Sequence, residues 1–373
     1  MPRPHDPRQD DHLALDSVPV PGAVFHAEQA LLGALLLAPH RRDTLSNITA
    51  SSFSTAVHRA LFAAIITLPI PAPDTHATNT TWLNQVIATA REQARALTAL
   101  YVHALIQVCP WPQHAPAYAR MVEADHARRR LRTGAEHLLH TVHGTSLPHP
   151  VPAVLAEAAT LTAAVDDIAT RFPPRAALLP RTPLPAPDPS PDHGEAAEEE
   201  EQALLATAAA HPADIGSARW LLPGDFTQPL HAGLWQCLNA LDRRHEPVDP
   251  VTVLWEAQQY GLLGEGSEPN QILRLLAQPA PPLEHWGQRV LRRSLLATAA
   301  HAARRIGTYA DDPANTPFQL IAGARRALAD LGAIHTRWQH ATGAIPPQRP
   351  RPVSAPRAGP PTTTAAHATH TPR

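Results

Sequence analysis

Apolar side chains along most of this chain recur at the spacing of an amphipathic helix. In residues 26–40, HAEQALLGALLLAPH, Leu31, Leu32, Leu35 and Leu36 fall on one face, and Pro39 ends the pattern. The same spacing predicts helices at about 55–68, 82–107, 117–143 and 151–170, with the segment PIPAPDTHATNTT breaking the chain after the first of these. Val and Ile are sparse while Ala and Leu dominate, which favours helices over sheet. The predicted fold class is therefore all-α.

Helical spacing also predicts which side chains are buried. The helix at about 55–68 should bury Leu61, Phe62, Ile65 and Ile66, and the helix at about 117–143 should bury Tyr118, Val122, Leu131, Leu138 and Leu139. Large aromatic side chains on such positions are expected to be core or interface anchors, namely Phe53, Phe62, Phe226, Trp235, Trp255 and Trp286.

The chain contains an internal duplication. The run EQALL occurs at residues 28–32 and again, 173 positions later, at 201–205, each time with a Pro eleven residues after the Glu. Without a gap, ten of the 45 positions in 24–68 are identical in 197–241. The same offset pairs Pro39 with Pro212, Phe53 with Phe226, His58 with His231 and Leu61 with Leu234. A shared Phe, His and Pro indicate a repeated structural unit more strongly than shared Leu does.

Proline-rich stretches divide the chain between the two copies. Residues 1–22 and 341–373 are predicted to be disordered, and the second of these holds four Arg and no acid. Residues 173–193, PPRAALLPRTPLPAPDPSPDH, are predicted to form an extended linker. The first copy then occupies 23–172 and the second 194–340. The long helix of the first copy has its counterpart at about 284–307, where Trp286 and Val290 align with Tyr118 and Val122.

Composition narrows the classes of function. The formal net charge is −2, and all 31 basic residues other than His are Arg, against 33 Asp and Glu. This balance does not indicate a basic nucleic-acid-binding protein. Two cysteines in unrelated contexts indicate a reducing compartment without a disulfide framework. Because no segment has the pattern of a signal peptide or a membrane span, the expected location is the cytoplasm.

Several motifs follow one another in an order that carries a family resemblance. They are AEQALLGALLLAP at 27–39, the Phe at 53, HRALFAAI at 58–65, and, in the second copy, EPVDPVTVLWEAQQYGLL at 246–263. YARMVEADHARRRL at 118–131 and WGQRVLRRSLL at 286–296 then begin the long helices. This order resembles the N-terminal domain of DnaB-type replicative DNA helicases. The resemblance implies two tandem helical bundles, each followed by a protruding helical hairpin.

The chain departs from the family pattern in informative places. The first copy has PAPDTHATNTTW in place of the PVD-x-VTV segment, and the second lacks a Gly at 206. Family members also carry a motor with a P-loop, G-x-x-x-x-G-K-[ST], whose Lys reaches the β- and γ-phosphates. This chain contains no Lys. We therefore expect no helicase or ATPase activity, no catalytic residues and no cofactor.

The resemblance also implies partners. In the family these domains assemble through their hairpins into a collar and bind primase and loader proteins. The implied function is a non-catalytic interaction protein of DNA replication that binds primase, the replicative helicase or both. The predicted interface lies on the hairpins, at about 115–145 and 284–308, through Tyr118, Val122, Trp286 and Val290. The hairpins are also candidates to pair with each other, within one chain or between chains.

A nucleic-acid-binding accessory factor is the alternative function. Its candidate phosphate contacts are Arg128, Arg129, Arg130 and Arg132 in the run RRRLR, together with Arg292, Arg293 and the basic tail. The same residues can also form a solvated helix face. The charge balance is +1 for 24–172 and −5 for 194–340, which argues against binding driven by counterion release.

The histidines offer a weaker hypothesis. His137, His140 and His143 recur at i, i+3 and i+6, a spacing at which two His can share a metal, but no third ligand has a fixed spacing to them. A solvated helix face and no metal are expected there. His58 and His231, which the duplication pairs, are expected to have structural roles.

Overall fold

The computed structural model describes residues 22–45, 47–144, 149–173, 179–183, 194–263 and 268–343. These residues form helices and contain no strand, so the predicted all-α class is confirmed. The segments predicted to be disordered at 1–22 and 341–373 lie almost entirely outside the described residues, as does most of the predicted linker at 173–193.

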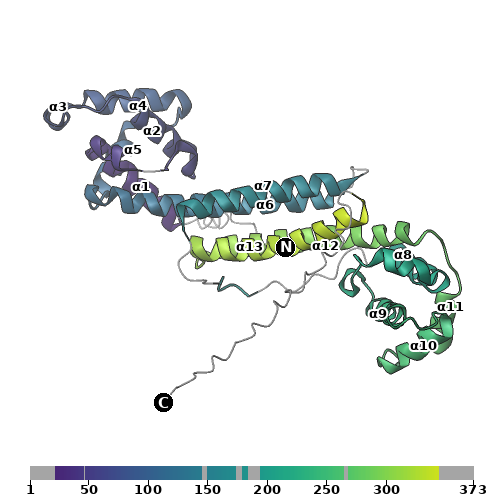
Figure 1. The fold of residues 1–373 in the computed structure, drawn as a ribbon. Coiled ribbons are helices and arrows are strands. Elements are labelled where there is room, and N and C mark those ends of the chain that lie inside the picture. The colour runs from purple at the N-terminus through teal and green to yellow at the C-terminus, as the bar shows by residue number, and fades with distance from the viewer. Residues whose placement is uncertain are drawn as a thin grey trace, which may run out of the picture.

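The first copy consists of a compact group of short helices followed by a helical hairpin (Figure 1). We call the group head 1; its helices are α1 (Ala23–Leu37), α2 (Ala56–Thr67), α3 (Pro73–Thr78), α4 (Thr81–Gln93) and α5 (Ala99–Val108), with 3₁₀ turns η1 (Pro39–Thr44), η2 (Ala50–Ser52) and η3 (Pro112–His114). The two arms of hairpin 1 are α6 (Ala115–His143) and α7 (Pro150–Arg171).

The second copy repeats this plan (Figure 1). Head 2 contains α8 (Glu195–Ala210), α9 (Pro229–Arg244), α10 (Pro250–Gln259) and α11 (Pro269–Leu276), with 3₁₀ turns η4 (Pro212–Ala218) and η5 (Pro223–Asp225). The arms of hairpin 2 are α12 (Leu283–Asp311) and α13 (Pro317–Ala341).

Side-chain caps set the beginnings of several helices. At α2, Oγ1 of Thr55 accepts a hydrogen bond from the backbone N–H of His58. At α10, the carboxylate of Asp249 accepts from the backbone N–H groups of Val251 and Thr252, at 2.8 and 3.0 Å. A Pro occupies the first position of α10, where its missing N–H costs no bond. The motif PVDPVTV is thus the start of a helix.

The observed helices differ from the predicted ones in three places. The segment predicted as a loop after α2 contains the short helix α3, which begins at a Pro. The helix predicted at 82–107 is two helices, because Thr98 caps a new start at α5. The ranges predicted for the hairpins, 115–145 and 284–308, cover only their first arms, α6 and α12, while α7 and α13 are the second arms.

Burial follows the predicted stripes with some corrections. Leu61, Phe62 and Ile65 are buried in α2, but Ile66 is 43% exposed. Ile66 lies one position beyond the apolar stripe, close to the end of the helix, so its side chain points away from the core. On the long helix, Tyr118 and Leu139 are half-buried, whereas Val122, Leu131 and Leu138 are fully buried.

The two hairpins lie against each other in antiparallel orientation, with the heads at opposite ends of the molecule (Figure 1). Helix α6 packs along α12, and α7 packs along α13. Phe172, at the end of α7, meets Phe318, at the start of α13, with ring centroids 6.2 Å apart in an edge-to-face contact. The pairing of the hairpins within one chain, which the duplication suggested, is present in this structure.

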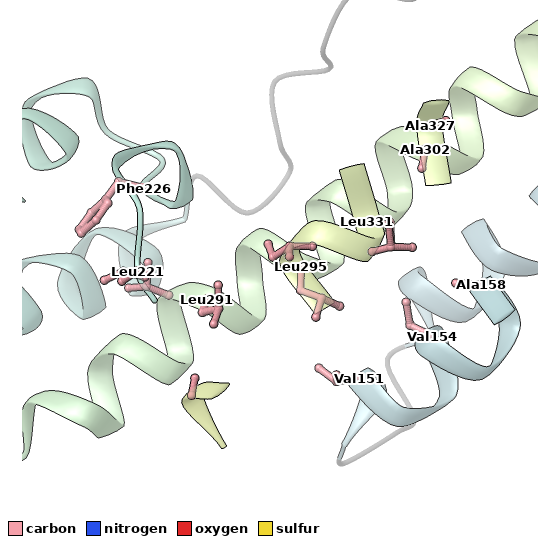
Figure 2. Packing of buried hydrophobic residues seen from close by; sticks show 14 of the residues in the cluster. Val151, Val154, Ala158, Leu221, Phe226, Leu291, Leu295, Ala302, Ala327 and Leu331 are labelled. Carbon is pink, nitrogen blue, oxygen red and sulfur yellow. The ribbon is translucent and has the colours of Figure 1, made fainter. Parts of the chain in front are cut away.

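Apolar residues of both copies form the core between the hairpins. Figure 2 shows Val151, Val154 and Ala158 on the side of α7 that faces hairpin 2, where Leu295 and Leu331 lie. The buried positions of α6 recur in α12 exactly 168 positions later: Ala127, Leu131, Ala135 and Leu138 correspond to Leu295, Ala299, Ala303 and Ile306. Head 1 has a separate core, from residue 27 to residue 122. Beyond that core, the arms of hairpin 1 are buried by each other and by the second copy.

Candidate interaction surfaces

A buried Glu–His pair joins three helices of head 1. Nδ1 of His58 lies 2.6 Å from Oε2 of Glu28, and both side chains are fully buried. Glu28 also accepts hydrogen bonds from the backbone N–H and the hydroxyl of Ser54, at 2.6 and 3.0 Å. Nε2 of His58 lies 2.6 Å from the hydroxyl of Tyr101 on α5. Because each polar atom of the pair has a partner, the pair is a structural link between α1, α2 and α5.

Head 2 repeats this arrangement. Nδ1 of His231 lies 2.7 Å from Oε2 of Glu201, and Glu201 accepts bonds from the backbone N–H and hydroxyl of Thr227, at 2.7 and 2.8 Å. Arg293 of α12 lies 3.4 Å from Glu201 and also forms an ion pair with Glu200. The repeated Glu and His of the sequence are thus explained by one structural role, and in head 2 that role extends to the hairpin.

Head 1 exposes a line of aromatic and apolar side chains at the turn before α6. The ring centroids of Trp111 and His114 are 6.4 Å apart, and those of His114 and Tyr118 are 6.2 Å apart. Met121 follows Tyr118 by one turn of the helix. Trp111 is 58% exposed and Met121 is 54% exposed. We call these four residues the head 1 patch, because exposed Trp and Tyr beside apolar surface are typical of protein-binding sites.

Head 2 exposes a second patch on α10. Val251 and Trp255 lie one turn apart and are 67% and 63% exposed, and Tyr260 follows at the end of the helix. We call these three residues the head 2 patch. The sequence placed Trp255 among core or interface anchors, and its exposure excludes the core.

Two Arg side chains of α6 fasten hairpin 1 to the end of α12. Arg128 donates hydrogen bonds of 2.5–3.3 Å to four carbonyl oxygens within residues 310–315. Nη2 of Arg132 lies 2.6 Å from Asp311. A cation at the C-terminus of a helix is favourable because the last carbonyl groups carry partial negative charge. We call Arg128 and Arg132 the clamp. The residues 168 positions later are Leu296 and Ala300, so the second copy has no equivalent clamp.

Comparison with known families decides the identity of the heads. The family model of the DnaB-like helicase N terminal domain matches residues 21–124 and 195–290, which together are more than half of the chain. The chain belongs to the DnaB-like helicase N-terminal domain family. Because the same model matches both copies, the predicted tandem duplication is confirmed. No curated protein and no solved structure matches the chain.

The matched segments of this DnaB-like chain are its heads and the first part of each long helix. The first match ends within α6 and the second within α12. Both exposed patches lie inside the matched segments. On α6 the core shared with hairpin 2 begins at Ala127, just beyond the first match.

The four apolar residues predicted as a partner interface divide into two kinds. Val122 and Val290 are 0% exposed within the buried clusters, so an approaching protein does not reach them. Tyr118 and Trp286 are half-buried at the starts of α6 and α12. Only Tyr118 belongs to an exposed patch. The sequence did contain a signal for Trp111, which stands between two prolines, where no helix face is available to bury it.

The Arg residues predicted to contact nucleic acid mostly bind groups of this chain. Beside the clamp of Arg128 and Arg132, Arg129 lies 2.8 Å from Asp125, and Arg130 lies 2.5 Å from Asp167. Arg293 pairs with Glu200. Arg292 is half-buried and makes no hydrogen bond or ion pair with another residue that the structure describes. These contacts reduce the number of Arg side chains free to form a phosphate-binding surface.

Other candidate chemistry is limited. His137, His140 and His143 are exposed on α6, and within the described ranges no group of three or more His, Cys, Asp or Glu is placed to hold a metal. Cys109 and Cys237 are buried free thiols. No described helix is both long and apolar enough to cross a membrane.

Proposed function

We propose that this chain is a non-catalytic interaction protein of the DNA-replication machinery, which binds primase, the replicative helicase or both in the cytoplasm. The observation that carries the proposal is the placement of two family heads at opposite ends of one body of paired hairpins (Figure 1). In the family that the sequence resembles, such domains pair through hairpins to form a collar. This chain makes one such pair by itself.

The sequence supports a role without catalysis. The chain has no Lys, and a P-loop uses a Lys to bind the β- and γ-phosphates. Each Glu–His pair links helices of its own head: His58 bonds to Glu28 and Tyr101, and His231 bonds to Glu201. Binding is therefore the property that this chain's residues support.

The exposed patches are the proposed contact surfaces. The inner faces of the hairpins are occupied by each other, so a partner meets the heads and the outer faces of the hairpins. The head 1 patch offers Trp111 and Tyr118, residue types that dominate binding energy at protein interfaces. The head 2 patch offers Trp255 in the same way.

A direct binding measurement tests the proposal. Primase and replicative helicase from the same cell are purified and titrated separately against the full-length chain at about 0.3 M salt, which suppresses phosphate-driven binding. We expect one of them to bind, and Trp111→Ala or Trp255→Ala to weaken that binding at least about tenfold, as at an interface hot spot. Leu100→Ala is the matched control, because Leu100 is 80% exposed in head 1 but lies outside the patch.

The outcomes separate the two functions considered. Binding that survives this salt and depends on a Trp supports the interaction protein. If neither protein binds, and the chain instead retains DNA with an affinity that falls steeply as salt rises, the proposal is wrong and the nucleic-acid-binding alternative replaces it.

A further inference from the structure

A pocket of about 330 Å³ opens between α6 and α7 on hairpin 1. Four nitrogen-bearing side chains of α6 line it, His126, Arg129, Arg130 and His137, together with Thr133. These residues recur on successive turns of one helix face, whereas Arg128 and Arg132 project toward hairpin 2. The run RRRLR therefore serves two faces of α6, one for the clamp and one for this pocket. We call it the hairpin 1 pocket.

Hydrogen-bonding capacity remains unused in the hairpin 1 pocket. Nδ1 of His126 is buried, and it has no hydrogen-bond partner among the described residues. A buried polar atom without a partner costs free energy that a ligand can return. Arg129 uses Nε and one Nη for Asp125 and Ser52, and Arg130 uses one Nη for Asp167. A guanidinium has five N–H groups, so both side chains keep donors for a ligand.

Three guanidinium groups act on His126 in the hairpin 1 pocket. Burial, together with the charges of Arg129, Arg130 and Arg171, lowers the pKa of His126 to about 4 against the opposing effect of Asp125. Arg129 is paired with Asp125, and Arg130 and Arg171 share Asp167, so each guanidinium keeps N–H donors beyond its ion pair. The opposite wall carries one acid, Glu157 of α7.

Comparison of the two copies shows that packing alone does not require these residues. The buried positions of α6 have apolar counterparts on α12, as described above. The pocket residues differ in side-chain type between the copies. The positions 168 residues after His126, Arg129, Arg130 and His137 hold Ser294, Ala297, Thr298 and Arg305. The same helical hairpin thus forms without this set of residues, so the set has a separate role.

We propose that the hairpin 1 pocket binds a phosphate group. Guanidinium groups bind phosphate through parallel N–H donors, and the pocket volume accommodates one phosphate with part of an attached group. The phosphate comes either from a free nucleotide or from the backbone of a nucleic acid. This site lies on the outer face of hairpin 1, apart from both exposed patches, and it does not depend on the partners proposed above.

Calorimetric titration of the full-length chain tests this site. The probes are inorganic phosphate, ADP and a short oligothymidylate, with thymidine as the probe that lacks phosphate. We expect saturable binding of at least one phosphate-bearing probe and none of thymidine. Arg130→Gln should weaken this binding about tenfold, because it removes one charge and its donors. Arg326→Gln, an exposed Arg on α13, is the matched control and should leave binding unchanged.

A second variant keeps the test decisive if Arg130→Gln disturbs the hairpin. Glu157→Gln removes the acid from the pocket wall and should tighten binding about threefold, an increase that structural damage does not produce. Binding of ADP or phosphate identifies a free ligand, and binding of the oligonucleotide alone identifies a backbone. Absence of saturable binding, or affinities that neither pocket variant changes, overturns the proposal. Circular dichroism confirms that each variant keeps its helix content.

Discussion

Glu28 and Glu201 are carboxylates enclosed by their heads, where water does not hydrate them. Each regains hydrogen bonds from fixed groups, namely a backbone N–H, a hydroxyl and a His ring. Those groups belong to the turn before the next helix and to that helix itself. One side chain on α1 or α8 therefore fixes where α2 or α9 begins.

Replacement of Glu28 by Gln tests this role at the residue scale. Gln keeps the shape but removes the charge, and its amide donors face the donors of Ser54. We expect Glu28→Gln to lower the free energy of unfolding by about 2–4 kcal/mol, measured by urea denaturation. Glu199→Gln is the control, because Glu199 is exposed and its replacement should change stability by less than about 0.5 kcal/mol. Equal effects of the two variants would contradict the role assigned to Glu28.

Cys237 gives a prediction of pH dependence. Burial, together with the charge of the nearby Glu256, raises the pKa of its thiol to about 12. The native thiol therefore stays protonated up to pH 10, and we expect no reaction with Ellman's reagent at pH 8 until urea unfolds the chain. An unfolded thiol ionises near pH 8.5, so unfolding releases a proton above that pH.

The free energy of unfolding should consequently fall as pH rises above about 8.5, because the native state then binds more protons than the unfolded state. Cys237→Ala should remove this part of the pH dependence. Rapid labelling of Cys237 in the native chain at pH 8 would show that the thiol is neither buried nor protonated.

At the scale of helices, α1 and α5 approach each other closely at Gly33. A Cβ atom added there would lie 2.2 Å from the carbonyl oxygen of Leu105 and 2.8 Å from Cβ of Cys109. Neither atom belongs to the flexible end of a side chain, so the helices themselves would have to move. The second copy has Ala206 at this position, so the close approach belongs to head 1.

Gly33→Ala should lower the free energy of unfolding by at least about 2 kcal/mol, although Ala favours helix more than Gly does. Gly307→Ala on α12 is the matched control, since nothing lies within 4 Å of the added Cβ. It should raise stability by about 0.5–1 kcal/mol through helix propensity alone. Chemical denaturation of both variants measures the contrast. A neutral effect at Gly33 would mean that α1 and α5 separate without cost.

The predictability of each element from sequence follows its length and periodicity. The regular stripes of α1, α2 and α6 predicted those helices closely, and Pro39 marked the end of α1. The short α3 and the start of α5 were missed, because a few residues carry no measurable period and local caps decide them. Helix α7 matches the helix predicted at about 151–170, whereas no range was predicted for α13, which is buried through contacts distant in sequence.

Residues of the candidate surfaces were harder to predict for a related reason. Apolar periodicity identified Val122 and Val290 as important, and they are, but as core residues. Periodicity marks burial, whereas a binding surface is marked by apolar side chains that a fold leaves exposed, such as Trp111. The hairpin 1 pocket depends on α7 lying beside α6, which no spacing within α6 specifies.

At the scale of the whole molecule, the two copies are held together by more than the chain between them. The hairpins share one apolar core, Arg128 binds the carbonyl groups at the end of α12, and Arg325 lies 2.9 Å from Asp166 across α13 and α7. Within the linker, the backbone N–H of Arg181 donates to Asn315, and Thr182 donates to Asp312. The turn between α12 and α13 is therefore hydrogen-bonded to both hairpin 1 and the linker.

A cut in the linker tests whether this interface is sufficient. Cleavage at a protease site introduced between residues 184 and 193 breaks the covalent connection between the two copies. The contacts of residues 179–183 stay in place. We expect the two fragments to elute together in size-exclusion chromatography at micromolar concentration, because a shared apolar core between hairpins resembles the interface of a stable dimer.

Arg128→Ala should weaken the association of the cut fragments at least about tenfold, since it leaves carbonyl groups at the end of α12 without their partner. Arg292→Ala, a half-buried Arg of the same hairpin pair without a described partner, should not. If the wild-type fragments separate after cleavage, the linker holds the two heads in one molecule and the interface between the hairpins does not. The proposal of a self-contained collar pair would then lose its structural basis.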